Sequence, residues 1–191
     1  DVDIFRLNMS HLSLDQLKKN LKFLKKNNIK NICIDTEGAQ VRTLLLKKKI
    51  FLKKNKKIKI STKKLGLKNC FQLYPNFLLK KIKIQTKIKV GFDGLELQVE
   101  KKFKNFVQCK VSSKGFLDSN KGVHFDNNIK LDPLTRKDIQ SILIAKKFGV
   151  KIFALSFANS ARDVLFFRSL INKNDELISK IETKRGFFNR K

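Results

Sequence analysis

Short apolar runs and one amphipathic segment alternate at the start of the chain. Residues 2–7 and 29–34 are apolar runs of strand length. Between them runs a stripe of leucines at spacings of three and four, which is typical of an amphipathic helix: Leu14, Leu17, Leu21 and Leu24. Ser13 and Gln16 form a capping box at its start, and we expect it to end near Asn27. The order strand, helix, strand predicts a βαβ unit.

The middle of the chain has a different rhythm. Polar and apolar residues alternate with a period of two in four segments: 57–61, 81–85, 95–99 and 106–111. This period indicates half-buried antiparallel strands. Asp93-Gly94 between two of them is a tight-turn signal. We therefore predict a small separate β-barrel here.

The α/β pattern returns after Asp132-Pro133. Thr135 is a helix N-cap, and Gly149 ends that helix. Residues 150–157 form a nearly continuous apolar strand, Ser160 caps another helix, and residues 177–181 form a last strand. The predicted fold class is α/β: a partial (β/α)8 TIM barrel with an inserted small all-β barrel domain. The expected boundaries are residues 1–43 for the first part of the barrel, 44–127 for the insertion and 128–191 for the second part.

Composition narrows the class of protein. Hydrophobic residues make up 41% of the chain, with 17 Phe, which is enough for a packed core. Lysines interrupt every apolar run, so we expect no membrane-spanning helix. The three cysteines lack metal-ligand spacing and are expected to be ordinary thiols of a cytoplasmic protein.

The net charge of +28 predicts attraction to polyanions. However, the lysines are spread along the whole chain, and the aromatic residues are not interleaved in a single-strand-binding pattern. We therefore interpret the excess as compositional drift on solvated faces and do not expect a nucleic-acid partner.

Polar residues gather where the predicted parallel strands end. These residues are Arg6, Asn8, Ser10 and His11 after the first strand, Asp35, Thr36 and Arg42 after the second, Ser156 in the third, and Lys180 and Glu182 after the last. Function in α/β barrels lies at the carboxyl ends of the strands. Each motif alone is better explained as a solvated face or a turn. Together, at one rim, they suit a phosphate and cations.

Six blocks of the sequence resemble the pyruvate kinase family, in that family's order. They are Arg-Leu-Asn-Met-Ser-His at 6–11, Asp-Thr-Glu-Gly at 35–38, Phe-Asp-Gly-Leu at 92–95, Asn-Lys-Gly-Val-His at 120–124, Ala-Leu-Ser-Phe at 154–157 and Ser-Lys-Ile-Glu at 179–182. The resemblance implies phosphoryl transfer between phosphoenolpyruvate and ADP, giving pyruvate and ATP in glycolysis.

The resemblance also implies residue roles. Lys180 and Arg6 would act on the transferring phosphoryl group, and Glu182 would hold Mg²⁺. Potassium would take oxygen ligands from four residues: Asn8, Ser10, Asp35 and Thr36. The nucleotide phosphates would face His11, Arg42 and Lys121. The family implies a homo-oligomer, a tetramer, in the cytoplasm.

Some positions depart from the family pattern. Gln40 stands where potassium-dependent members carry Glu, which argues against a potassium requirement. The resemblance covers barrel strands two to five and the lid, so we expect little activity from this polypeptide alone. The alternatives are a catalytically reduced relative that binds a phosphorylated metabolite and, ranked last, a basic nucleic-acid-binding protein.

Overall fold

The structure is a computed structural model, and it describes residues 2–75, 78–127 and 129–189. The chain divides into two compact units. The first unit comprises residues 1–39 and 131–191, and the second comprises residues 40–130. Each unit is described by itself below.

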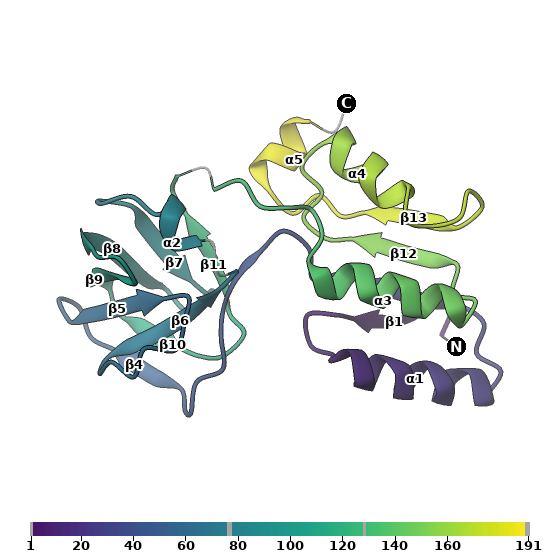
Figure 1. The fold of residues 1–191 in the computed structure, drawn as a ribbon, viewed down its shortest axis with the longest axis horizontal. Helices are drawn as coiled ribbons and strands as arrows, with labels where there is room; N and C mark the ends of the chain where they lie inside the picture. Colours follow the sequence, from purple (N-terminus) through teal and green to yellow (C-terminus); the bar gives the residue numbers. More distant parts are fainter. Residues whose placement is uncertain (1, 76–77, 128, 190–191) are drawn as a thin grey trace. The chain divides into compact units, whose positions relative to one another are not determined.

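A parallel sheet forms the centre of the first unit (Figure 1). Its strands, in spatial order, are β1 (Phe5–Asn8), β2 (Ile32–Asp35), β12 (Ile152–Leu155) and β13 (Glu176–Ser179). The register places Asn8 beside Asp35, Asp35 beside Ala154, and Leu155 beside Ser179. The carboxyl ends of all four strands therefore meet at one edge, as the βαβ prediction required.

Helices α1 (Leu14–Lys26), α3 (Arg136–Lys147) and α4 (Ala161–Arg168) each precede the next strand of the sheet, and α5 (Lys184–Phe188) follows β13. The predicted capping box of Ser13 with Gln16 forms at the start of α1, and the predicted N-cap Thr135 forms a second box with Asp138 at the start of α3. Ser160 is the N-cap residue of α4 but makes no side-chain capping bond. Among the described residues, no helix has the length and apolar character needed to cross a bilayer.

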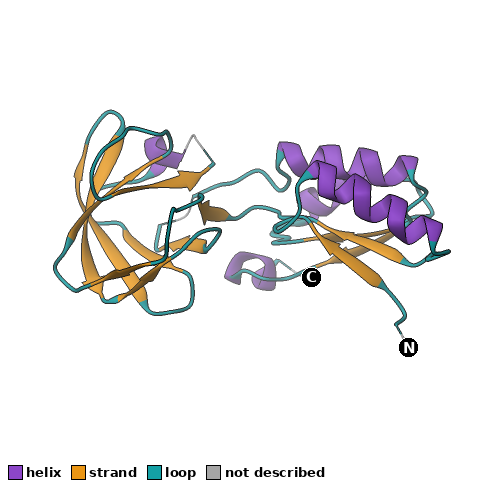
Figure 2. Ribbon diagram, turned by 90° about the horizontal axis from the view of Figure 1, so that it is seen from below, coloured by secondary structure: helices purple, strands orange, loops and turns teal. Residues whose placement is uncertain are grey.

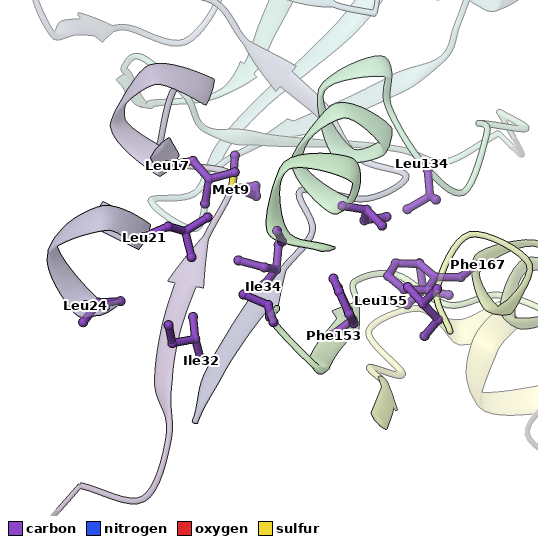
Figure 3. Packing of buried hydrophobic residues seen from close by; sticks show 14 of the residues in the cluster. Met9, Leu17, Leu21, Leu24, Ile32, Ile34, Leu134, Phe153, Leu155 and Phe167 are labelled. Carbon is purple, nitrogen blue, oxygen red and sulfur yellow. The ribbon is translucent and has the colours of Figure 1, made fainter. Parts of the chain in front are cut away.

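Helices α1 and α3 pack against each other and lie on the same side of the sheet (Figure 2). The leucine stripe of α1 is buried as predicted, in Leu17, Leu21 and Leu24. These side chains pack with Ile34 and Phe153 from the sheet (Figure 3). Each large apolar side chain that is fully buried contributes roughly 1.5–3 kcal/mol, so this layer holds the strand ends in place.

The second unit is a closed β-barrel, in agreement with the predicted all-β insertion. Around the barrel, its strands are β11 (Gly122–Phe125), β3 (Val41–Thr43), β6 (Cys70–Tyr74), β5 (Lys57–Ser61), β9 (Phe106–Ser113), β8 (Leu95–Lys102) and β7 (Lys87–Val90). A ribbon of β4 (Ile50–Leu52) with β10 (Gly115–Leu117) and the short helix α2 (Leu78–Lys81) complete the described elements of the unit. Buried side chains alternate with exposed ones on β5, β8 and β9, as the period of two predicts.

One predicted strand, residues 81–85, is wrong. Lys81 ends α2, and the neighbouring strand β7 begins only at Lys87. The alternation of lysine and isoleucine gave a wrong prediction here. Ile82 is fully buried whereas Ile84 is 55% exposed, so the two isoleucines do not share a core face.

The edges of other elements differ from the predictions by a few residues. Val2 is exposed, so the first strand begins at Phe5. The segment 41–43 was expected in the first part of the (β/α)8 barrel. It is instead strand β3 of the second unit, because Arg42 pairs with Tyr74 and Gly122.

Candidate functional site

Asp35 is the centre of the polar cluster at the carboxyl ends of the parallel strands. It ends β2, which is central in the sheet, and its side chain is completely buried. A buried carboxylate is costly unless charged partners and hydrogen bonds compensate it. Those partners come from the strands on either side.

Two cationic side chains meet this carboxylate. The Lys180 ammonium lies 3.1 Å from each oxygen of Asp35, and the Arg6 guanidinium lies 3.2 Å from Oδ2. Arg6 comes from β1, whereas Lys180 directly follows β13. The Lys180 side chain is 27% exposed and that of Arg6 59%, so solvent reaches the cations although the carboxylate is covered.

Hydroxyl groups connect Asp35 to the carboxyl end of β12 by hydrogen bonds. Ser156 Oγ lies 2.9 Å from Asp35 Oδ1 and 2.6 Å from the Thr36 carbonyl oxygen, and it accepts a hydrogen bond of 3.0 Å from Lys180. Thr36 Oγ1 donates to the Ala154 carbonyl and accepts from the Ser156 amide. These bonds restrict the Asp35 and Lys180 side chains to one arrangement.

Glu182 adds a second carboxylate next to the lysine. Its Oε1 lies 3.5 Å from Lys180 Nζ, and its Oε2 accepts a hydrogen bond of 3.0 Å from the Phe157 amide. Phe157 has a φ of +55°, an uncommon conformation for a bulky residue that brings the amide into this position. Glu182 is exposed, so its carboxylate can also reach a ligand.

The loop after β1 is held by local bonds. Asn8 Oδ1 accepts a hydrogen bond from the Ser10 amide, and the Met9 amide donates to the Asp35 carbonyl. The His11 amide donates to the Asn8 carbonyl, and the His11 side chain is exposed. These residues thus belong to the same edge of the sheet as Asp35.

The two remaining predicted residues belong to the second unit. Arg42 lies on β3 and donates to the Asn120 carbonyl at 3.1 Å. Lys121 precedes β11. Its amide donates a hydrogen bond to the Thr43 hydroxyl, and its carbonyl accepts one from the Thr43 amide. Gln40 begins the same unit, beside Gly122.

A buried brace behind Asp35 was not foreseen. The Asp138 carboxylate accepts hydrogen bonds from the amides of Glu37 and Gly38 as well as from Thr135. Burial raises the pKa of Asp138 above its ordinary value. Gly38 is essential to this loop, because its φ is +67° and a Cβ would lie 2.5 Å from the Ser156 carbonyl. The sequence signal was only the capping box, which does not reveal a second set of partners.

Two of the three cysteines, one in each unit, have buried thiols. Burial, aided by the nearby Asp35 carboxylate, raises the pKa of Cys33 to about 11. Burial likewise raises the pKa of Cys109 to about 12. A protonated, covered thiol is neither a nucleophile nor a metal ligand at neutral pH, in line with the expectation of ordinary thiols.

The oxygen atoms of the cluster differ in how they suit the two implied metals, Mg²⁺ and potassium. Glu182 offers a partly exposed carboxylate of the hard-oxygen kind that Mg²⁺ takes together with substrate oxygens. The described residues contain no group of three or more His, Cys, Asp or Glu that could hold a metal by itself. Of the four expected potassium ligands, Asp35 contacts two cationic groups, and Asn8 and Thr36 take part in internal hydrogen bonds.

The arrangement is that of a site for a small, multiply charged anion. It combines two fixed, solvent-accessible cations with a carboxylate able to share a divalent ion, at the edge of a parallel α/β sheet where ligands bind. Such a set of groups in a parallel α/β unit is compatible with the class of phosphate-binding α/β proteins.

Comparison with known proteins identifies the family. The family model described as "Pyruvate kinase, barrel domain" matches residues 1–190. A pyruvate kinase of Borreliella burgdorferi is 29% identical over 194 residues, which cover 98% of this chain and 41% of the relative. A pyruvate kinase of Staphylococcus haemolyticus is 29% identical over 202 residues and is covered over 34% of its length. This chain belongs to the pyruvate kinase family and spans 34–41% of the length of these relatives.

Proposed function

We propose that the chain supplies part of the active site for the phosphoryl transfer of pyruvate kinase, between phosphoenolpyruvate and ADP, giving pyruvate and ATP in glycolysis, and that this polypeptide alone has little turnover. The observation that carries this proposal is the contact of Lys180 and Arg6 with buried Asp35 at the carboxyl edge of the sheet. We further propose that the four parallel strands are part of a (β/α)8 barrel.

Lys180 is the residue that we assign to the reacting group. A phosphoryl group in transfer spreads negative charge over its oxygens, and catalysis consists mainly of positioned positive charge. Asp35 and Ser156 hold the Lys180 ammonium by three hydrogen bonds, so its charge needs little reorganisation during the reaction. The same ammonium can neutralise the enolate that forms as the phosphoryl group leaves.

Arg6 is the residue that we assign to the phosphate of the substrate. Its Nη1 is engaged with Asp35, and the guanidinium has further N–H donors whose fork geometry matches phosphate oxygens. Asp35 is then a positioning residue that fixes both cations at a constant separation. Its burial keeps it from competing for the metal.

Glu182 would hold Mg²⁺, which supplies charge neutralisation on the substrate oxygens when bound. We leave potassium out of the proposal because Gln40 stands where potassium-dependent members of the family carry Glu. From the family resemblance we propose that His11, Arg42 and Lys121 contact nucleotide phosphates. A homo-oligomeric, cytoplasmic protein is part of the same proposal.

A binding measurement tests this function, since the chain covers only part of its relatives' length. Isothermal titration calorimetry with phosphoenolpyruvate and Mg²⁺ should give Mg²⁺-dependent binding. Loss of a charge-assisted hydrogen bond in Lys180→Met should weaken it roughly 10- to 100-fold. Lys89→Met, which removes an exposed lysine of the barrel unit, is the matched control and should bind normally.

A coupled turnover assay on the same preparations tests the expectation of little activity. Turnover at ordinary kinase rates would support an active kinase and refute that expectation, whereas binding without turnover agrees with the incomplete kinase and with a reduced relative that only holds a phosphorylated metabolite. Equal affinity in the wild type and Lys180→Met would refute the assignment of this site.

A further inference from the structure

The outer face of the barrel unit brings phenylalanines and lysines together. Lys57 and Lys59 lie on β5, on the side opposite the buried Ile58 and Ile60. On the neighbouring strand β9, Lys110 pairs with Lys57 in the antiparallel register. Phe106 begins β9, and Phe103 precedes it in the hairpin from β8. We name this set the phenylalanine–lysine face: Lys57, Lys59, Phe103, Phe106 and Lys110.

The two aromatic rings of this face are stacked, and solvent reaches them. The Phe103 and Phe106 ring centroids lie 4.5 Å apart with an angle of 19° between the planes. The Lys59 ammonium lies 5.5 Å from the centroid of Phe106. Phe103 is 45% exposed, and Phe106 is half-buried. The inward positions of β9 are taken by Val107, Cys109 and Val111, so Phe106 lies on the opposite side of the strand from the barrel interior.

The charge around this face is strongly positive. Residues 40–130 hold 24 of the 44 Lys and Arg residues of the chain and only five of its 16 acids. Within the part of the chain that the structure describes, Lys57, Lys59 and Lys110 form no ion pair. Neighbouring like charges repel, so a bound polyanion or salt would relieve the repulsion among these three lysines.

We propose that the phenylalanine–lysine face binds single-stranded nucleic acid. Nonspecific single-strand sites combine a cationic track for the backbone with aromatic side chains on which bases stack. The sequence alone argued against this, because no segment interleaves rings with basic residues. The fold changes that argument, since pairing of β5 with β9 places lysines next to rings that are more than forty residues away in the chain.

The same combination occurs a second time in the barrel unit. Phe51 of β4 and Phe116 of β10 make an edge-to-face pair with centroids 5.0 Å apart. The Lys49 ammonium lies 4.2 Å from the Phe116 ring. Both rings are partly exposed. This second pair supports a polymer ligand over a small anion. The proposal does not involve Lys180, so it stands or falls independently of the kinase assignment.

Fluorescence anisotropy of a labelled oligouridylate of about 12 nucleotides, titrated with residues 1–191, tests the proposal. In Phe103→Leu/Phe106→Leu the rings are lost while apolar side chains stay, and affinity should fall roughly 10-fold or more. In Lys57→Gln/Lys110→Gln the slope of log affinity against log salt should decrease by roughly 1.4, since two phosphate contacts are removed.

Matched charge loss on the other unit is the control. Lys22→Gln/Lys26→Gln on the exposed side of α1 removes the same charge and should leave both affinity and salt slope unchanged. Protection of the Cys109 thiol, buried on β9, reports that the barrel stays folded in every variant. An equal effect of the control pair would show diffuse attraction and overturn the proposal.

Two further probes decide what the face recognises. An abasic oligonucleotide of equal length should bind more weakly than oligouridylate, because it offers phosphates without bases to stack. Equal binding of the two would overturn the proposal. So would cosedimentation with vesicles of phosphatidylcholine and phosphatidylserine when oligouridylate does not bind.

Discussion

Removing the Lys180 ammonium should destabilise the first unit through the charge that it leaves behind. Asp35 is completely buried, and Lys180 lies 3.1 Å from both of its oxygens. Breaking a buried pair costs about 3–5 kcal/mol when the remaining charge has no other partner. Arg6 stays at 3.2 Å, and Lys180 is partly exposed, so we expect about 2–3 kcal/mol for Lys180→Met.

A double-mutant cycle isolates the pair itself. Lys180→Met, Asp35→Asn and the double variant should give a coupling free energy of about 1.5–3 kcal/mol. The matched control is Lys89 with Glu96, whose charged atoms are also 3.1 Å apart but whose side chains are 68% and 39% exposed. Its coupling should be at most about 1 kcal/mol, because water screens it.

Pulsed thiol labelling along a urea series, quantified by peptide mass spectrometry, measures each unit separately. Cys33 is buried in the first unit and Cys109 in the second. Lys180→Met should move the labelling transition of Cys33 and leave that of Cys109 in place. If the Lys180–Asp35 coupling were no larger than the Lys89–Glu96 coupling, the reasoning from burial would be refuted.

Other predictions use the same labelling assay. Gly38→Ala, whose Cβ would collide with backbone, should cost at least about 2 kcal/mol more than Gly66→Ala, which has the same positive φ in open space; equal costs would contradict this. In the native protein at neutral pH, Cys33 and Cys109 should resist alkylation because they are buried with pKa values of about 11 and 12; reaction at free-thiol rates would contradict this. Because the pKa of Asp138 is raised in the fold, its contribution to stability should fall as pH rises above the ordinary Asp pKa of about 4, and Asp138→Asn should lack this decline.

Local signals explain the parts of the fold that could be predicted. The leucine stripe of α1 and its capping box depend on neighbours within one or two helical turns, so the sequence contains the whole cause. Strand ends were less predictable. Residues 81–85 alternate like a strand, yet Ile84 faces solvent because a helix and a turn take up this segment. Alternation of types is a strand signal only where the backbone is extended.

The position of the site could be predicted from the sequence, but its geometry could not. The predicted order of strands places Arg6, Asp35 and Lys180 at one edge of a sheet. The distances, the complete burial of Asp35 and the brace from Asp138 depend on partners about 100 residues away, which no local pattern encodes. The phenylalanine–lysine face was missed for the same reason.

The central claim is that the edge around Asp35 binds phosphoenolpyruvate with a divalent metal. A crystal of residues 1–191 soaked with phosphoenolpyruvate and Mn²⁺, and measured for anomalous scattering of manganese, tests it most directly. We expect a manganese peak at the Glu182 carboxylate, with the substrate phosphate between Lys180 and Arg6. Substrate or metal bound at another place, with this edge empty, would contradict the account.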